Sequence, residues 1–233
     1  MNIIADETKK KEILQLIRER SWSDRTGLHF SDLNYCLRKP YYREKYPDIA
    51  MEQEKEDTTL IFSLGHAWEY WLTRTDEHHE YKQDGITCTP DFSYREGEIW
   101  EIKATYLSAR KDIREQTTWL RQCMAYCKVT GVTTFYIVPL HVMGTWDGIW
   151  KKKGENLDRR RPLMNVWRCE FTQEEIDVNW ELGLHKKKLL EEAIATSNPM
   201  GNPMQEKWEC GFCLWQKKGI CEIGASVVDK KKR

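Results

Sequence analysis

The chain has 233 residues, of which 40% are hydrophobic and 32% charged, as is typical of a folded globular protein with one large domain or two small ones. Its 37 Lys and Arg residues balance 37 Asp and Glu residues, and the resulting net charge of zero excludes DNA binding through overall positive charge but not through a local basic groove. Since the sequence shows neither a secretory signal nor an apolar run near the roughly 20 residues of a membrane span, we expect a cytoplasmic protein without membrane attachment.

The N-terminal part of the chain combines helices with less regular segments. Apolar residues spaced three and four apart predict helices at 6–20 and 58–75. Between them we expect a loop at 21–34, an aromatic and basic segment at 35–46, and an exposed acidic segment at 48–57. The second helix has the stronger apolar stripe, which indicates that it packs on a core.

The next segment changes from helical to strand periodicity. Apolar and polar residues alternate at 86–92 and again at 98–104, which predicts two strands. The residues between them, 94–97, end in a glycine and form a turn signal, so the two strands are predicted to pair as a β-hairpin.

The rest of the chain completes a mixed α/β (α+β) pattern. The predicted elements are a helix at 109–130 ended by Gly131, a strand at 132–140, a basic connection at 144–162, a strand at 163–171, and a helix at 172–196 opened by a capping box of Thr172 and Glu175. This order of elements predicts a mixed sheet flanked by helices.

The predicted hairpin carries two carboxylates and a lysine. Side chains two apart on a strand share a face, so Glu101 and Lys103 point the same way, and the turn brings Asp91 opposite residue 100 or 101. Two carboxylates, with the backbone carbonyl of Ile102, are oxygen ligands suited to Mg²⁺ or Mn²⁺. A metal there would lower the pKa of a bound water, and the ammonium could orient that water.

A Glu-x-Lys pair alone would also suit a row of ion pairs on an exposed strand. Here it follows Pro90-Asp91 and a short turn, and this pattern resembles the PD-(D/E)xK nuclease superfamily. The resemblance implies a restriction-endonuclease-like fold and a phosphodiester hydrolase. It also implies that Asp91, Glu101 and Lys103 are catalytic, with both carboxylates as metal ligands.

Two helical motifs extend the resemblance to RecB-like members of that superfamily. Gly65-x-x-x-Glu69 matches a motif whose last residue reaches the metal, which makes Glu69 the implied ligand. His66 is a second candidate, for metal or for DNA, and it also suits an ordinary helix surface. Gln122-x-x-x-Tyr126 matches a motif that contacts DNA or orients the lysine, although such a pair is also common on helix surfaces.

Eight cysteines in a cytoplasmic chain indicate metal binding or packing rather than disulfides. Half of them fall on apolar faces and are expected in the core: Cys88, Cys123, Cys127 and Cys169. Cys210 and Cys213 form a C-x₂-C knuckle and Cys221 follows after seven residues, while Cys36 lies in a polar, aromatic and basic segment. These four form the candidate metal site: Cys36, Cys210, Cys213 and Cys221. Four thiolates can hold zinc or a 4Fe–4S cluster, and the spacing alone does not choose between them.

One N-terminal cysteine, a nuclease core and three C-terminal cysteines resemble the layout of iron–sulfur RecB-like nucleases, over about residues 30–222. This group includes CRISPR-associated RecB-like exonucleases and phage homologues. The resemblance implies a 4Fe–4S cluster on the four cysteines, rather than zinc. A cluster that joins the two ends of the chain would stabilise the fold, because metal binding then contributes to folding.

We accordingly divide the chain into four parts. Residues 1–34 form an N-terminal helix and linker, and 58–196 form the nuclease core. Between and after these, 35–57 together with 197–224 form a cluster subdomain, and 225–233 is a basic tail.

The resemblance further implies a metal-dependent exonuclease for single-stranded or end-bearing DNA in a prokaryotic or phage-infected cell. It would serve CRISPR adaptation, as part of antiviral defence, or recombination. The expected DNA contacts are Arg38 and Lys39 with the phosphate backbone, Tyr42 with a stacked base, and Gln122 and Tyr126 through the helical motif.

DNA is the expected partner, with a CRISPR integrase or a recombination protein as a second one, and a net charge of zero permits a homo-oligomer. Two other classes of protein stay open. One is a non-catalytic DNA-binding or assembly subunit that keeps the nuclease fold and cluster. The other is a zinc-ribbon protein with a fortuitous Glu-x-Lys pair.

Overall fold

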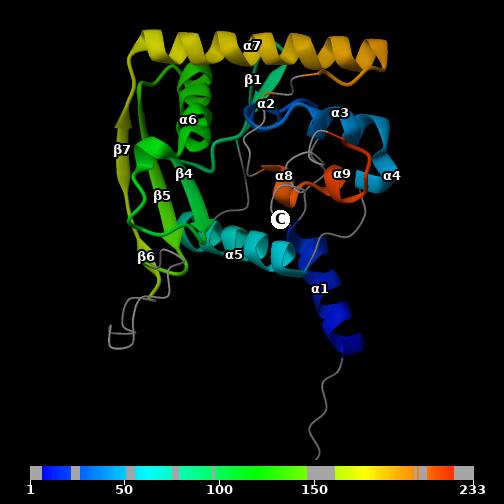
Figure 1. Cartoon of the computed structure of the whole chain (residues 1–233). Helices are drawn as coiled ribbons and strands as arrows, with labels where there is room; N and C mark the ends of the chain where they lie inside the picture. Colours follow the sequence, from blue (N-terminus) through cyan, green and yellow to red (C-terminus); the bar gives the residue numbers. More distant parts are fainter. Residues whose placement is uncertain are drawn as a thin grey trace, which may run out of the picture.

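The computed structural model describes residues 7–21, 27–50, 56–74, 79–95, 98–145, 161–201, 204 and 209–222. Within these residues a mixed sheet forms one side of the molecule (Figure 1). Its strands are β3 (Phe92–Arg95), β4 (Glu98–Thr105), β5 (Thr134–His141), β6 (Leu163–Met164) and β7 (Trp167–Glu170). β4 and β5 run parallel, and the other pairs run antiparallel.

Helices cover both faces of this sheet, which confirms the predicted fold class. α5 (Glu56–Thr73) packs on β4, where a Cβ built on Gly65 would lie 3.9 Å from the Cβ of Ala104. α6 (Thr117–Thr130) covers the other face, and α7 (Gln173–Thr196) lies along the outside of α6 (Figure 1). The capping box of Thr172 and Glu175 at the start of α7 is present as predicted, with Glu175 N 3.2 Å from Thr172 Oγ1.

The N-terminal helix is confirmed as α1 (Glu7–Ser21), but the loop expected at 21–34 ends in a short helix, α2 (Phe30–Asn34). Phe30 is buried and stacks on Trp180 of α7, with ring centroids 6.0 Å apart. This packing stabilises a helix that is too short to form on its own. Two further helices, α3 (Arg38–Lys45) and α4 (Pro47–Ala50), follow in the aromatic, basic and acidic segments.

The predicted hairpin is present with a correction to its first strand. The expected strand 86–92 splits into β2 (Ile86–Cys88) and β3, and β2 pairs with β1 (Tyr81–Gln83) in a separate two-stranded sheet. The turn at Asp84 and Gly85, whose φ values of 51° and 71° are those of a tight hairpin, pairs β2 with β1, and Pro90 lies in the break between β2 and β3. β3 then pairs with β4 in the predicted antiparallel manner.

The helix expected at 109–130 begins later than predicted, at Thr117. It is preceded by the 3₁₀ turn η1 (Ile113–Glu115), where the Asp112 side chain accepts a hydrogen bond from Arg114 N at 2.9 Å. This local cap favours a separate turn over a continuous helix. The predicted end at Gly131 is confirmed, with a φ of 75°.

The C-terminal region folds back toward the N-terminal segments. Two short helices, α8 (Glu209–Phe212) and α9 (Leu214–Lys217), lie beside α3 (Figure 1). The strand expected at 163–171 is present as β6 and β7, and most of the basic connection at 144–162 lies outside the described residues. The four-part division of the chain stays a prediction. No helix in the described part of the chain combines the length and apolar character needed to cross a bilayer.

Candidate functional site

The start of β3 and the middle of β4 bring together the three residues of the predicted carboxylate–lysine site. Phe92 pairs with Trp100, so the residue before Phe92 comes beside Glu101. Asp91 Oδ2 accepts a hydrogen bond from the backbone N of Ile102 at 2.6 Å, and this bond fixes the carboxylate at the strand. The ammonium of Lys103 forms an ion pair with Glu101 on the same face of β4.

Glu101 is a charged side chain with no exposed surface. Its carboxylate is paired with the Lys103 ammonium, and no other described residue donates a hydrogen bond to its oxygens. Burial, with a smaller contribution from the charge of Asp91, raises the pKa of this carboxyl from 4.5 to about 8 against the opposing effect of Lys103. Such a carboxylate needs a positive partner in order to be stable in its ionised form.

Lys103 is the more accessible member of the ion pair, with 27% of its side chain exposed. Burial alone would lower the pKa of its ammonium, but the nearby carboxylates of Glu101 and Asp91 outweigh burial and raise the pKa above the usual value. The side chain is therefore a permanent cation at neutral pH. It can donate hydrogen bonds at the open side of the site.

The predicted Gln-x-x-x-Tyr pair on α6 also lies at this site. Gln122 Nε2 donates to Tyr126 Oη at 2.5 Å, so the two side chains form one unit. Burial raises the pKa of the Tyr126 hydroxyl well above its usual range, and the charges of Glu101 and Asp91 raise it further. The pair thus stands next to the carboxylates, and the phenol stays protonated.

The two candidate residues of α5, Glu69 and His66, differ in their exposure. Glu69 is half-buried one turn after Gly65, on the side of α5 that packs on β4. Ala104, which Gly65 faces, points to the side of β4 opposite Glu101 and Lys103. Glu69 of α5 therefore approaches β4 from the face opposite Glu101 and Lys103, and its role as a metal ligand stays a prediction. His66 is exposed, as expected of the helix-surface alternative.

The carboxylates of Asp91 and Glu101 suit a divalent cation. Among the described residues the buried carboxylate of Glu101 has Lys103 as its only partner, and the carboxylate of Asp91 is close enough to raise the pKa of Glu101. Oxygen donors of this kind fit Mg²⁺ or Mn²⁺. In the described part of the chain, no three His, Cys, Asp or Glu side chains converge as a complete metal site, so backbone or water oxygens would complete the coordination.

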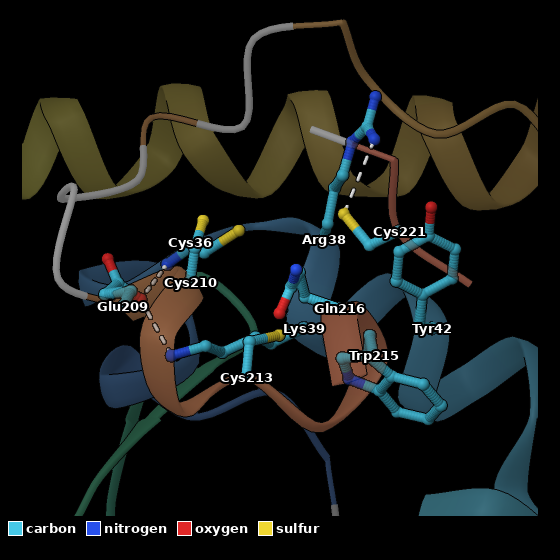
Figure 2. A pocket seen from close by; sticks show the side chains of 10 residues that line it. All are labelled: Cys36, Arg38, Lys39, Tyr42, Glu209, Cys210, Cys213, Trp215, Gln216 and Cys221. Atoms are coloured by element: carbon cyan, nitrogen blue, oxygen red, sulfur yellow. Dashed lines mark hydrogen bonds and ion pairs between the residues drawn. The ribbon is translucent and has the colours of Figure 1, made fainter. Parts of the chain in front are cut away.

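A second site is formed by the four cysteines predicted to bind a cluster, all of which line one pocket (Figure 2). They come from both ends of the chain: Cys36 from the segment between α2 and α3, Cys210 from α8, Cys213 from the start of α9 and Cys221 from just beyond it. All four are free thiols. Their donor set fits four-thiolate ligation, although the side chains do not already converge around an ion.

The four other cysteines occupy the core, as predicted from their apolar faces. Cys88, Cys123 and Cys127 are buried, and Cys169 is half-buried. Burial raises the pKa of the Cys88 and Cys127 thiols to about 12, so these groups are protonated at neutral pH. Such thiols serve packing rather than metal binding.

Two basic residues that were expected to contact DNA have partners in the cysteine pocket. Arg38 donates from Nε to the carbonyl of Met200 at 2.9 Å, and its Nη1 lies 3.7 Å from Cys221 Sγ (Figure 2). Lys39 forms an ion pair with Glu209 at 2.8 Å. These contacts supply positive charge beside the thiols, and DNA binding by the two residues stays a prediction.

Two tyrosines expected to contact DNA are buried. Tyr42 is 5% exposed and packs against Trp215, with ring centroids 5.7 Å apart, and Tyr126 is 4% exposed. Rings buried to this degree offer little surface to a base, and contact of these two tyrosines with DNA stays a prediction. Their packing instead supports the two sites.

Glu209 is a residue of the cysteine pocket that the sequence reasoning missed. It is 1% exposed, and its Oε2 accepts from Cys36 N at 3.0 Å and from Lys39 Nζ at 2.8 Å. Since Cys210 is the next residue, this one carboxylate ties an N-terminal cysteine to a C-terminal one. Its only signal in the sequence is its position beside Cys210, which does not predict a contact 173 residues away.

Neither a family model nor a curated protein matches the chain. Among solved structures, the crystal structure of SSO0001 is similar with a TM-score of 0.58 and 16% identity, over 92% of this chain and 96% of that one. A phage-related exonuclease from Haemophilus somnus 129PT is similar with a TM-score of 0.50 and 11% identity, over 80% of this chain and 100% of that one. At these identities the similarity shows a shared fold.

Proposed function

We propose that this protein is a metal-dependent deoxyribonuclease that hydrolyses phosphodiester bonds at DNA ends. The observation that carries the proposal is the fully buried Glu101 between Asp91 and Lys103, whose carboxylate has Lys103 as its only partner among the described residues. The fold shared with a phage-related exonuclease agrees with it.

Each residue of the site has a distinct task in this proposal. Asp91 and Glu101, with the carbonyl of Ile102, would hold Mg²⁺ or Mn²⁺, with Glu69 as a further candidate ligand. The bound cation would lower the pKa of the attacking water and offset the negative charge of the phosphodiester. Lys103, a cation at neutral pH, donates hydrogen bonds to the water or to a phosphate oxygen.

The pair on α6 acts through its neighbours. The hydrogen bond between Gln122 and Tyr126 holds a protonated phenol beside two carboxylates, which keeps a further negative charge out of the site. We propose that this pair positions Glu101 and Lys103 rather than touching the reacting atoms. A buried hydrogen-bonded pair is well suited to hold such a geometry.

We further propose that Cys36, Cys210, Cys213 and Cys221 hold a 4Fe–4S cluster. Arg38 and Lys39 stand at the pocket and would offset the negative charge of four thiolates. The cluster would join the two ends of the chain and so contribute to folding rather than to hydrolysis. A CRISPR integrase or a recombination protein is the partner that we propose alongside DNA.

Cleavage of DNA labelled separately at each end, with Mg²⁺ or Mn²⁺ added, tests the proposed activity. The wild type should shorten the DNA, whereas Asp91→Ala and Lys103→Ala should each lose about 100-fold or more in rate. Lys188→Ala, at an exposed position of α7, is the matched control and should cleave normally. Circular dichroism checks that all the variants are folded.

The result also separates the proposed nuclease from an assembly subunit. DNA that is bound but never shortened, under any metal, would favour a non-catalytic DNA-binding protein. Normal cleavage by Lys103→Ala would mean that another group supplies the positive charge and that the site is wrongly assigned.

A further inference from the structure

A cavity of about 230 Å³ shares Asp91 with the carboxylate–lysine site, but neither Glu101 nor Lys103 lines it. On one side it is lined by His79 and Tyr81, from the start of the β1–β2 hairpin, and on the other by Ser93 of β3. Apolar side chains complete it, from Pro90, Phe92 and Ile99. The cavity thus lies between two separate sheets.

The strand that borders the cavity is an edge strand. β3 pairs with β4 alone among the described strands, so one side of its backbone has no strand partner there. Backbone N–H and C=O groups are therefore open to a partner along that edge of β3. Pockets with an apolar lining and a few polar groups are the usual binding sites for small planar ligands.

The walls of the cavity include two aromatic rings. The rings of His79 and Tyr81 are 4.7 Å apart between centroids and stand at 63° to each other. His79 is exposed and Tyr81 is half-buried, in contrast to the buried rings of Tyr42 and Tyr126. Accessible aromatic faces of this kind are what nucleic-acid-binding proteins use to stack single bases.

The position of the cavity relative to Asp91 suggests which base it would hold. Asp91 lines the cavity, while its Oδ2 is held by the backbone N of Ile102 at the carboxylate–lysine site. A phosphodiester that reaches the carboxylates would thus have a neighbouring nucleotide at the mouth of the cavity. We propose that this cavity binds the base of the nucleotide next to the scissile phosphodiester. The base would stack on one ring of the Tyr81–His79 pair and meet the other ring at its edge, because the two rings stand at 63° to each other.

This inference rests on the proposed nuclease function for the register of the DNA, but base binding itself can be measured without cleavage. Short single-stranded DNAs, each with one 2-aminopurine at a different position, serve as probes, because 2-aminopurine fluorescence is quenched when the base stacks. Binding is measured in Ca²⁺, and the length of each DNA is checked afterwards. The wild type should quench one position near an end more strongly than its neighbours.

The variants test whether stacking on the rings of the cavity causes that quenching. His79→Ala and Tyr81→Leu should lose it and should bind the DNA about tenfold more weakly. Tyr81→Phe keeps the ring and should behave as the wild type. His185→Ala removes an exposed histidine of α7 and serves as the control, with quenching unchanged. Because His79 is exposed, its removal tests the cavity even if a variant at residue 81 folds poorly.

The outcomes distinguish this inference from the proposed function. Quenching that depends on His79 and Tyr81, in a protein that cleaves no DNA, would support the cavity and overturn the nuclease. Normal cleavage without position-dependent quenching, or quenching that survives His79→Ala and Tyr81→Leu, would overturn the cavity and leave the nuclease intact. Failure of the wild type to bind the probes would also overturn base binding.

Discussion

Replacing Glu101 by Gln should remove a pH-dependent instability from the metal-free protein. The unfolded carboxyl ionises near 4.5, whereas burial and the charge of Asp91 raise the pKa in the folded protein to about 8. Between these values the folded state binds more protons than the unfolded state. The free energy of unfolding therefore falls as the pH rises from about 4.5 to about 8 and is constant above that range.

The size of the effect follows from the pKa difference. Since one pKa unit corresponds to about 1.4 kcal/mol, ionisation of Glu101 costs on the order of 5 kcal/mol of stability at most. Glu101→Gln keeps the shape of the side chain without its charge. The variant should match the wild type at low pH and be several kcal/mol more stable than it above about pH 8.

Urea unfolding in EDTA, at about pH 5 and about pH 9, measures this difference. In a second series with Mg²⁺ at the higher pH, the wild type should gain stability, because the cation partners the ionised carboxylate. Glu101→Gln should gain much less. Equal pH dependence in the two proteins, or an equal gain from Mg²⁺, would refute the assignment of Glu101 as a buried metal ligand with a raised pKa.

Three further predictions concern the cysteine pocket and the core. Cys213→Ser should lose the visible absorption of the cluster and lower the melting temperature, whereas Cys169→Ser, outside the pocket, should keep the absorption. Glu209→Gln removes the charge that pairs with Lys39, so the iron content per chain should fall. Urea unfolding should show a free energy of unfolding lower by about 1–2 kcal/mol, and unchanged iron would contradict a positioning role for Glu209. Gly183→Ala should destabilise the fold by about 1–3 kcal/mol in the same assay, because its Cβ would lie 2.8 Å from the ring of Phe30, and a neutral result would show that the ring moves freely.

Local patterns in the sequence were sufficient for much of the fold. The capping box of Thr172 and Glu175 and the left-handed Gly131 predicted helix ends that the structure confirms, because caps depend on residues within one turn. The same holds for the β3–β4 pairing, where the spacing of Asp91 and Glu101 around a short turn was enough to predict their approach. These features involve contacts between residues close in sequence.

Features set by distant contacts were not predicted. The helix at Phe30 forms because its ring stacks on Trp180, 150 residues later. The turn at Asp84 is anchored by the indole N–H of Trp180 at 2.9 Å, although its Asp-Gly pair is itself a hairpin signal that could have placed it. No spacing rule connects such pairs, since tertiary packing decides them.

The candidate site shows the same division. The face shared by Glu101 and Lys103 follows from strand geometry alone. The ion pair of Lys39 with Glu209, by contrast, joins a residue predicted to contact DNA to a carboxylate 170 residues away. A basic residue in a sequence carries no information about which distant carboxylate it will meet.

One anaerobic preparation of the wild type, measured in two ways, tests the central claim most directly. Its visible spectrum and metal content report the cluster, and DNA labelled at each end reports cleavage with Mg²⁺ or Mn²⁺. We predict a coloured, iron-containing protein that shortens DNA from an end, and this cleavage should stop when EDTA is added. A colourless protein that contains zinc and leaves the DNA intact would contradict both the cluster and the nuclease.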